Sequence, residues 1–453
     1  MLNNINLSQE ECLITSESQM TDIFYNGQKD AKTLAQKLVG VEFEKLPVSL
    51  KNYSSVNYKD VARLLLMYKP ENSLSVKEND SILGLNIQEG TLTLEPGAQT
   101  EISLKPLPEI SRVESILKCY NKTTAKLADS LGFCWLGYGI QPVSVYKDIN
   151  IIPKKRYECM TKYLPTVAKK PLVMMRETSG IQASFDYKSE SDAMRKFRFA
   201  LKLSPIVSAM YSNSPVRQGK LTKYKSNRSA SWLDTDSVRC GLVSEKIFNK
   251  DFSFSDYVDV LSDVPMIFIE RTINGQKKVF QTGKLTFRQF YQSGFMGFRA
   301  TTADWENHLS LYFSDVRLKS YIEIRNHDNQ RQNLICSVPA LWKGLIYNDD
   351  AMDYIESLLK KLSYFDYEYL RHKTPQTGID IEIKGLNLQN IAKEIVETSY
   401  FSLKENGNDE EKYLEPLLSL VQKSKTPADL IIDLWQNEWN KDVSKLVQYS
   451  KLV

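Results

Sequence analysis

The sequence predicts an α+β fold in which a large β-sheet carries helices packed against its apolar face. Three observations support this prediction. From about residue 38 to residue 340, short segments alternate polar and apolar residues, which is the period of strands with one buried face. Segments with helical periodicity lie between them, and the end of the chain, residues 386–453, reads as helical. With 453 residues, 42% of them hydrophobic and 25% charged, the chain can bury a large core.

The first 30 residues read as a polar leader, followed by a single domain over residues 31–453 whose helical C-terminal portion is residues 386–453. The leader has no apolar core region, so no secretory signal is expected. No apolar stretch approaches the ~20 residues that span a bilayer, so no membrane association is expected. The six cysteines are scattered and form no CxxC pair. These features predict a cytoplasmic protein with reduced thiols.

The first predicted strand, residues 38–45, places Glu42 and Glu44 on one face and apolar residues, Phe43 among them, on the other. Carboxylates two residues apart on a strand stand ~7 Å apart, which is close enough to serve neighbouring metal ions.

Three further segments repeat this alternation. Their polar residues are Glu95 and Glu101 in residues 91–103, where Pro96-Gly97 should break the strand, Gln182 in residues 180–187, and Glu323 and Arg325 in residues 321–325. One such segment alone is more often an ordinary half-exposed strand. Four together favour a cleft lined by polar strand faces.

Converging carboxylates repel one another unless cations are bound. Hard oxygen donors without His or Cys clusters favour Mg²⁺, with Mn²⁺ as the alternative, and Mg²⁺ usually binds together with phosphate oxygens. ATP is therefore the expected companion. The sequence has no G-x-x-x-x-G-K-[ST] motif and no convincing G-x-G-x-x-G motif after a strand, so we expect an ATP site built on the carboxylate-lined sheet.

Other segments read mainly as scaffold. Ser189 to Asp192 resembles a capping box that opens a helix continuing to Leu203, and Thr426-Pro427 is a typical helix start. Arg228 lies in a polar, turn-rich stretch and is the residue type suited to bidentate contacts with carboxylates or phosphates.

The net charge of +4, from 59 basic and 55 acidic residues without a dense basic block, predicts no nucleic-acid partner.

An ordered series of motifs is similar to that of the plant-type glutamate–cysteine ligases, which also occur in bacteria. The matching segments include Gly40-Val-Glu-Phe-Glu-Lys45, Leu94-Glu-Pro-Gly-Ala-Gln-Thr-Glu-Ile-Ser103, Arg156-Tyr157, Met174-Met175, Ser226-Asn-Arg-Ser229, Trp232-Leu-Asp-Thr-Asp236, Asp304-Trp-Glu-Asn-His308 and Val316-Arg-Leu-Lys-Ser-Tyr-Ile-Glu-Ile-Arg325. The resemblance covers roughly residues 35–440.

The resemblance implies a glutamine synthetase-like catalytic fold, an antiparallel sheet curved into a carboxylate-lined funnel with helices outside. It also implies site residues. These are Glu42, Glu44, Glu95, Glu101, Gln182 and Glu323 around the metal ions, Arg325 and Lys319 at ATP, Met174, Met175, Thr178, Arg228 and Trp232 at the amino-acid substrates, and Arg325 and Arg228 in catalysis.

The implied activity is ATP-dependent joining of L-glutamate to L-cysteine through a γ-glutamyl phosphate, which is the first step of glutathione-type thiol biosynthesis. Its cofactor would be Mg²⁺, with Mn²⁺ as the alternative, and the protein would be a monomer or weak homodimer. One alternative is a ligase of the same chemistry that uses a different amine acceptor. A non-catalytic relative that binds nucleotide or amino acid is the other.

Three positions depart from the plant pattern. Phe43 stands where plant members have a histidine, and the strand pattern points it away from the cleft. Glu177 replaces a basic residue of the family's M-M-x-R-T, a departure that bears on the second substrate. Residues 281–302 contain no cysteine, so no plant-like redox switch is expected.

Overall fold

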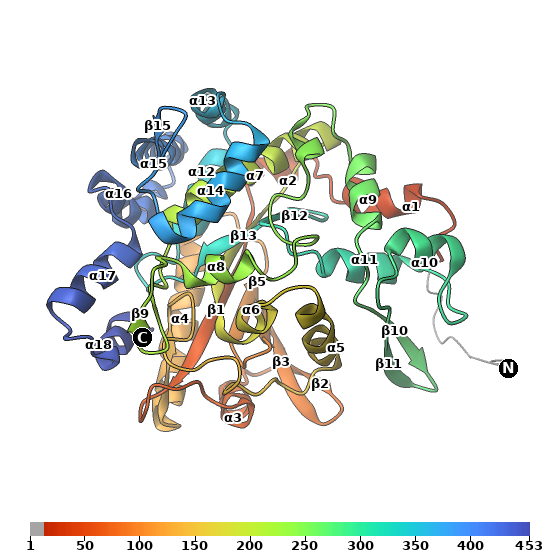
Figure 1. The fold of residues 1–453 in the computed structure, drawn as a ribbon, viewed down its shortest axis with the longest axis horizontal. Coiled ribbons are helices and arrows are strands. Elements are labelled where there is room, and N and C mark those ends of the chain that lie inside the picture. The colour runs from red at the N-terminus through yellow and green to blue at the C-terminus, as the bar shows by residue number, and fades with distance from the viewer. Residues whose placement is uncertain (1–12) are drawn as a thin grey trace.

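At the centre of the molecule lies a nine-stranded antiparallel sheet (Figure 1), formed within residues 13–453, which are the residues that the computed structural model describes. The strand order is β12-β13-β7-β1-β5-β4-β3-β2, and β6 pairs with the last part of β1. The strands are β1 (Val39–Ser49), β2 (Leu74–Glu78), β3 (Ser81–Ile87), β4 (Gly90–Leu94), β5 (Thr100–Leu104), β6 (Phe133–Leu136), β7 (Gly180–Phe185), β12 (Val316–Leu318) and β13 (Ile322–Asp328).

The four alternating segments found in the sequence all belong to this sheet, which confirms the strand predictions. Residues 38–45 lie mostly in β1, residues 180–187 mostly in β7, and residues 321–325 mostly in β13. Residues 91–103 divide into β4 and β5, and the Pro96-Gly97 break lies in the turn between them. The alternation was informative because each strand has one face in the apolar core and the other at a cavity.

The strand register brings the polar residues of different strands onto one face. Glu44 on β1 lies directly opposite Glu101 on β5. Glu42 lies opposite Gln182 on β7, and Glu323 on β13 lies opposite a serine of β7. Because directly opposed residues of antiparallel strands point to the same side, these side chains share one face of the sheet.

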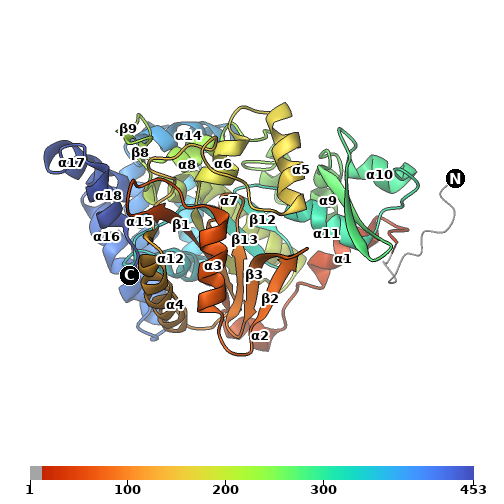
Figure 2. The same ribbon diagram turned by 90° about the horizontal axis from the view of Figure 1, so that it is seen from below.

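The other face of the sheet packs against helices (Figure 2). These are α4 (Ile110–Ser130), α7 (Glu190–Met210) and α12 (Ser337–Ile346), and α15 (Leu388–Glu405) packs behind α12. Phe43 is fully buried in this core. Its position confirms that the residue replacing the plant histidine points away from the carboxylate face.

Three short helices lie on the carboxylate side of the sheet, where Figure 2 shows them opposite α4. They are α5 (Lys155–Tyr163), α6 (Pro171–Glu177) and α8 (Asn227–Trp232). Helices were predicted only on the apolar face, so this second helical layer is an addition to the prediction. The hairpin of β10 (Phe268–Ile273) and β11 (Gln276–Gln281) projects beside α5 (Figure 1).

The remaining elements surround these layers. They are α1 (Ser18–Tyr25), α2 (Ala31–Ala35), α3 (Tyr58–Tyr68), β8 (Val216–Arg217), β9 (Lys220–Leu221), α9 (Phe254–Ser262), α10 (Phe287–Ser293), α11 (Thr302–Ser310), α13 (Asp349–Leu359), α14 (Tyr364–Thr377), β14 (Glu382–Ile383), β15 (Leu386–Asn387), α16 (Glu415–Gln422), α17 (Pro427–Asn437) and α18 (Val443–Ser450), with short 3₁₀ turns at Leu164–Thr166, Glu245–Phe248 and Glu411–Leu414. The predicted helix starts are confirmed, because Ser189 caps α7 and Thr426 forms a capping box with Asp429 at α17.

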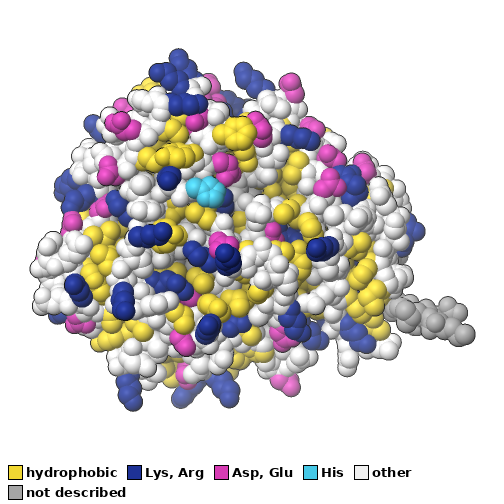
Figure 3. All heavy atoms as spheres, in the orientation of Figure 1, with side chains coloured by type: hydrophobic (Ala, Val, Ile, Leu, Met, Phe, Trp, Pro, Cys, Tyr) yellow, Lys and Arg dark blue, Asp and Glu magenta, His cyan; other side chains and the backbone are white. Residues whose placement is uncertain are grey.

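The segment that precedes β1 contributes to the core. Residues 1–12 of the predicted leader lie outside the described residues, whereas Ile14, Met20 and Phe24 are buried. The domain limits proposed from the sequence stay a prediction. Within residues 13–453, no helix has the length and apolar character needed to cross a membrane. On the face seen in Figure 3, basic side chains are spread among acidic ones.

Candidate active site

A cavity of about 350 Å³ lies between the polar face of the sheet and helices α5, α6 and α8. Its lining includes every residue that the sequence analysis assigned to the site, namely Glu42, Glu44, Glu95, Glu101, Met174, Met175, Thr178, Gln182, Arg228, Trp232, Lys319, Glu323 and Arg325. These residues come from β1, the β4–β5 turn, β5, α6 and the residue after it, β7, α8, the β12–β13 turn and β13, so only the tertiary fold brings them together. The roles assigned to them stay predictions.

The carboxylates on β1 and β5 repel one another. Burial, followed by the charges of Glu42, Glu95 and Glu44, raises the pKa of Glu101 well above its usual value. Burial and the charge of Glu95 raise the pKa of Glu44 to about 7, although Arg228 and the Gly180 N–H oppose that shift. The pKa of Glu42 is raised by burial and by Glu323. A cation bound among these groups would remove the repulsion.

Glu323 lies in a different electrostatic environment. Its carboxylate accepts hydrogen bonds from Arg317 Nε at 2.7 Å, Arg325 at 3.0 Å and Lys319 at 3.2 Å. Burial opposes ionisation, but these three cations together hold the pKa of Glu323 well below its usual value. No role was predicted for Arg317 from the sequence. Arg317 lies on β12, directly opposite Glu323 on β13, and is the nearest partner of that carboxylate.

Arg325 occupies an irregular part of β13. The register of β13 against β7 shifts between Ile324 and His327, and such bulges change the direction of side chains. The guanidinium of Arg325 donates to Gln182 Oε1 at 2.7 Å as well as to Glu323. Although burial opposes the charged form, Glu323 and Glu42 raise the pKa of Arg325.

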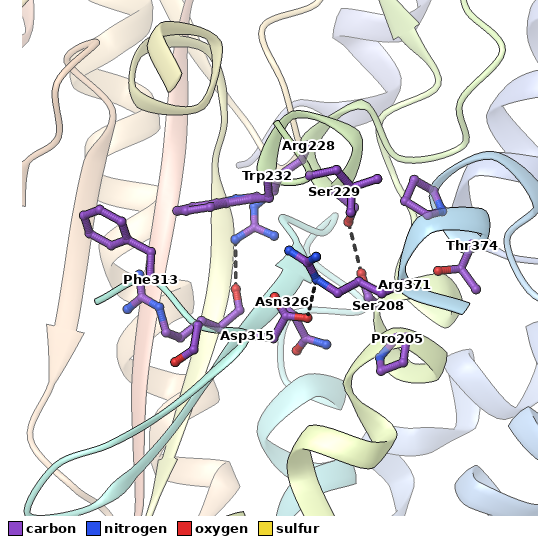
Figure 4. Close-up of a pocket in the computed structure, with 14 residues that line it drawn as sticks. Pro205, Ser208, Arg228, Ser229, Trp232, Phe313, Asp315, Asn326, Arg371 and Thr374 are labelled. Carbon is purple, nitrogen blue, oxygen red and sulfur yellow. Dashed lines mark hydrogen bonds and ion pairs between the residues drawn. The ribbon is translucent and has the colours of Figure 1, made fainter. Parts of the chain in front are cut away.

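Arg228 and Trp232 extend from α8 and line the cavity together with Arg325; Figure 4 shows both side chains. Arg228 donates to the backbone carbonyl of Arg325 at 2.8 Å. Arg228 Nε and the indole Nε1 of Trp232 are buried and have no hydrogen-bond partner among the described residues. Buried donors of this kind are costly unless a ligand satisfies them, so they mark this wall as a place for an anionic group.

The same two side chains, with Phe313 and Arg325, also border a smaller pocket, which Asp315 and Arg371 line as well (Figure 4). Arg371 and Asp315 form an ion pair with atoms 3.4 Å apart.

Sequence reasoning missed the contribution of α5 and the residue before it. Lys154, Arg156, Tyr157 and Met160 line the cavity, and the Tyr157 hydroxyl donates to Glu95 Oε2 at 3.0 Å. Arg156-Tyr157 belongs to one of the matched motifs, and that match was the one sequence feature that could have pointed to α5 as part of the site. Periodicity could not show that this helix faces the sheet.

The structure also locates Glu177. This side chain is absent from the cavity lining and forms an ion pair with Arg217 on β8, with Arg217 Nε donating at 2.6 Å. The substitution in M-M-x-R-T therefore puts no extra negative charge into the cavity.

The donor set fits a hard divalent cation. Glu42, Glu44, Glu95 and Glu101 supply oxygen donors, and their mutual repulsion favours bound positive charge. Within the described part of the chain, no three His, Cys, Asp or Glu side chains are close enough to hold an ion by themselves. An ion here would take the rest of its shell from water or from a ligand, which is typical of Mg²⁺.

A solved glutamate–cysteine ligase from Francisella tularensis, in complex with AMP, has a similar fold. The TM-score is 0.54 at 14% sequence identity, and the match covers 91% of this chain and 88% of that chain. The predicted fold class, an antiparallel sheet with a carboxylate-lined face and helices packed on the other side, is confirmed.

Plant proteins are more similar in sequence. A chloroplastic glutamate–cysteine ligase from Nicotiana tabacum is 33% identical over 414 residues, which is 90% of this chain and 78% of the relative. The chloroplastic enzyme of Arabidopsis thaliana is 32% identical over 445 residues, which is 97% of this chain and 84% of the relative.

These relatives contradict the prediction of a cytoplasmic location, because they are chloroplastic proteins. The prediction of a cytoplasmic location was wrong because it took the absence of a secretory signal as evidence against any targeting segment. The missing apolar core argues against a secretory signal but not against an organelle transit peptide, because transit peptides are amphipathic and have no such core.

A family model agrees with these relatives over most of the sequence. The model, described as glutamate-cysteine ligase family 2, matches residues 38–449, from the start of the first active-site strand into the last helix. The family predicted from the motifs is therefore confirmed, and with it the prediction that the protein is a ligase. This chain belongs to glutamate-cysteine ligase family 2.

Proposed function

We propose that this protein joins L-glutamate to L-cysteine in an ATP-dependent reaction that forms γ-glutamylcysteine, the first step of glutathione-type thiol biosynthesis. The observation that carries the proposal is the single cavity in which five glutamates face a group of arginines and lysines. Such a site can bind a metal–nucleotide complex and an amino acid with two carboxylates at the same time. The names of the plant relatives support the same substrates.

The chemistry has two steps. An oxygen of the glutamate γ-carboxylate attacks the γ-phosphorus of ATP, and ADP leaves, giving an acyl phosphate. The deprotonated α-amine of cysteine then attacks the activated carbonyl carbon, and inorganic phosphate leaves with the oxygen that came from glutamate. No enzyme nucleophile is required, so the side chains act by position and charge.

Arg325 and Lys319 stabilise negative charge on the transferred phosphoryl group. Glu323 and Gln182 hold Arg325 in place before substrates arrive, so little reorganisation is needed during the reaction. Arg228 and Trp232 offer unsatisfied N–H donors to a carboxylate of glutamate.

Mg²⁺ is the proposed metal, with Mn²⁺ as the other candidate. Glu42, Glu44, Glu95 and Glu101 would supply the protein oxygens around the metal ions, and water or a ligand would complete each shell. When bound, the metal neutralises phosphate charge. Glu323 and Gln182 were also predicted as metal ligands. Because both already bind Arg325, we assign them the orientation of Arg325 and leave metal binding to the four glutamates.

Product analysis tests the proposal. Purified protein with Mg-ATP and glutamate should release ADP in a cysteine-dependent way and form a product with the mass of γ-glutamylcysteine. In mixtures of amines, cysteine should outcompete the others. A product with a different amine would keep the chemistry but reject cysteine as the acceptor. The absence of turnover with every amine would contradict the proposal and favour a non-catalytic role.

A further inference from the structure

The last residues of α6 form part of the cavity wall. Met174 and Met175 line the cavity, and so does Thr178, which follows the helix. Between them, Glu177 points the opposite way and is fully buried. A buried carboxylate must be fully paired, so its contacts determine where this segment can lie.

Glu177 is held by three hydrogen bonds. Arg217 donates to its carboxylate from Nε at 2.6 Å and from a terminal nitrogen at 2.8 Å, and the Tyr146 N–H donates at 2.8 Å. The Gln141 N–H also donates to the Glu177 backbone carbonyl at 2.7 Å. The bidentate Arg217 pair connects the end of α6 to the β8–β9 hairpin, and the backbone N–H groups of Tyr146 and Gln141 connect it to the loop that follows β6.

A second set of contacts fixes the backbone of the same segment. The Gln99 amide donates to the carbonyls of Met175 at 3.2 Å and Thr178 at 2.8 Å. Gln99 belongs to the turn that carries Glu95. At Gly97 in this turn, an added Cβ would lie 2.3 Å from the Arg176 carbonyl oxygen, so the turn and the helix are in close contact. The methionine wall is thus held between the carboxylate turn and the Glu177–Arg217 pair.

The chemistry of this wall suits one of the two amino acids. Met160, Met174 and Met175 present apolar, polarisable thioethers, which favour a small sulfur-containing side chain over a carboxylate. The carboxylates of glutamate require the cations on the Arg228 and Arg325 side instead. We propose that the Glu177–Arg217 pair positions the methionine wall and thereby sets the affinity for the thiol-bearing acceptor. This inference rests on the proposed ligase function.

Kinetics of Glu177→Gln and Arg217→Gln, singly and combined, test the inference. Each single variant should raise KM for cysteine roughly tenfold, the equivalent of one weakened hydrogen bond to a charged group. KM for ATP and for glutamate should stay within about twofold of wild type, because their proposed contacts lie on other elements. The double variant should resemble the single ones, since both remove the same contact. Arg217 is partly exposed, so its variant remains informative if Glu177→Gln folds poorly.

Glu410→Gln is the matched control. Glu410 is also buried and paired, with Lys343 at 2.6 Å, but it is not part of the cavity lining. This variant should lower thermal stability without changing KM for cysteine. Equal increases in KM for all three substrates, or unchanged KM for cysteine, would overturn the inference.

Hydrogen exchange separates this inference from the proposed function. In Glu177→Gln, the backbone amides of residues 174–178 should exchange faster than in wild type, while those of β1 should not change. Unchanged exchange at 174–178 would reject the positioning role, whether or not the wild-type protein is active. A wild-type protein that forms no γ-glutamyl product would reject the proposed function.

Discussion

Replacement of Arg325 by alanine should lower kcat about 10²–10³-fold, the usual cost of removing one preorganised group that stabilises the transition state. Arg325 lines the cavity, and its guanidinium is oriented by Gln182 and Glu323. The fold should survive, because Glu323 retains its contacts with Arg317 and Lys319. The measurement is kcat at saturating ATP, glutamate and cysteine, combined with thermal unfolding.

Arg195→Ala is the control for this prediction. Arg195 forms ion pairs with Asp349 and Asp353 on the surface and is not part of the cavity lining. Its variant should keep wild-type kcat. An Arg325→Ala protein with kcat within threefold of wild type would rule out the proposed role. Glu323→Gln is a less clean test, because it leaves three cations without their shared carboxylate and should also destabilise the fold.

Replacement of Glu101 by glutamine should have opposite effects on metal binding and on stability. Glu101 lies directly opposite Glu44, and burial together with neighbouring carboxylates raises its pKa well above the usual value. In the presence of EDTA, the variant should therefore unfold at a higher temperature than wild type, because one member of a repelling buried pair has become neutral. The Mg²⁺ concentration for half-maximal activity should rise at least ~10-fold, since a proposed ligand is lost.

Glu71→Gln gives the matched comparison. Glu71 is exposed and is not part of the cavity lining, so neither quantity should change in its variant. If Glu101→Gln shows an unchanged Mg²⁺ requirement, the carboxylate face does not hold the metal. If it is less stable than wild type in EDTA, the proposed repulsion between Glu101 and its neighbours is wrong.

The strands that carry the site were predictable because a period of two fixes which side chains share a face. That rule separated Glu42 and Glu44 from Phe43 before any tertiary information was used. The rule carries no information on which strands pair, so the opposition of Glu44 and Glu101 emerged only from the register. The bulge at Arg325 could not be predicted either, because a bulge is defined by the pairing of β13 with β7.

Residues on short helices were harder to place. Tyr157 and Met160 reach the cavity because α5 lies across the carboxylate face, and no local pattern encodes that docking. The partner of Glu177, Arg217, is 40 residues away in the sequence, so its neutralising contact could not be anticipated. The contact between Arg317 and Glu323 likewise depends on the pairing of β12 with β13, which places the two residues opposite each other.

The most direct test of the account follows an oxygen atom. Glutamate carrying ¹⁸O in its γ-carboxylate is incubated with the protein, Mg-ATP and cysteine, and the released phosphate is analysed by mass spectrometry. If the γ-carboxylate attacks ATP inside this cavity, each phosphate released during dipeptide formation carries one ¹⁸O. Unlabelled phosphate together with dipeptide formation would show that the carboxylate is not activated by phosphoryl transfer, and would contradict the central claim.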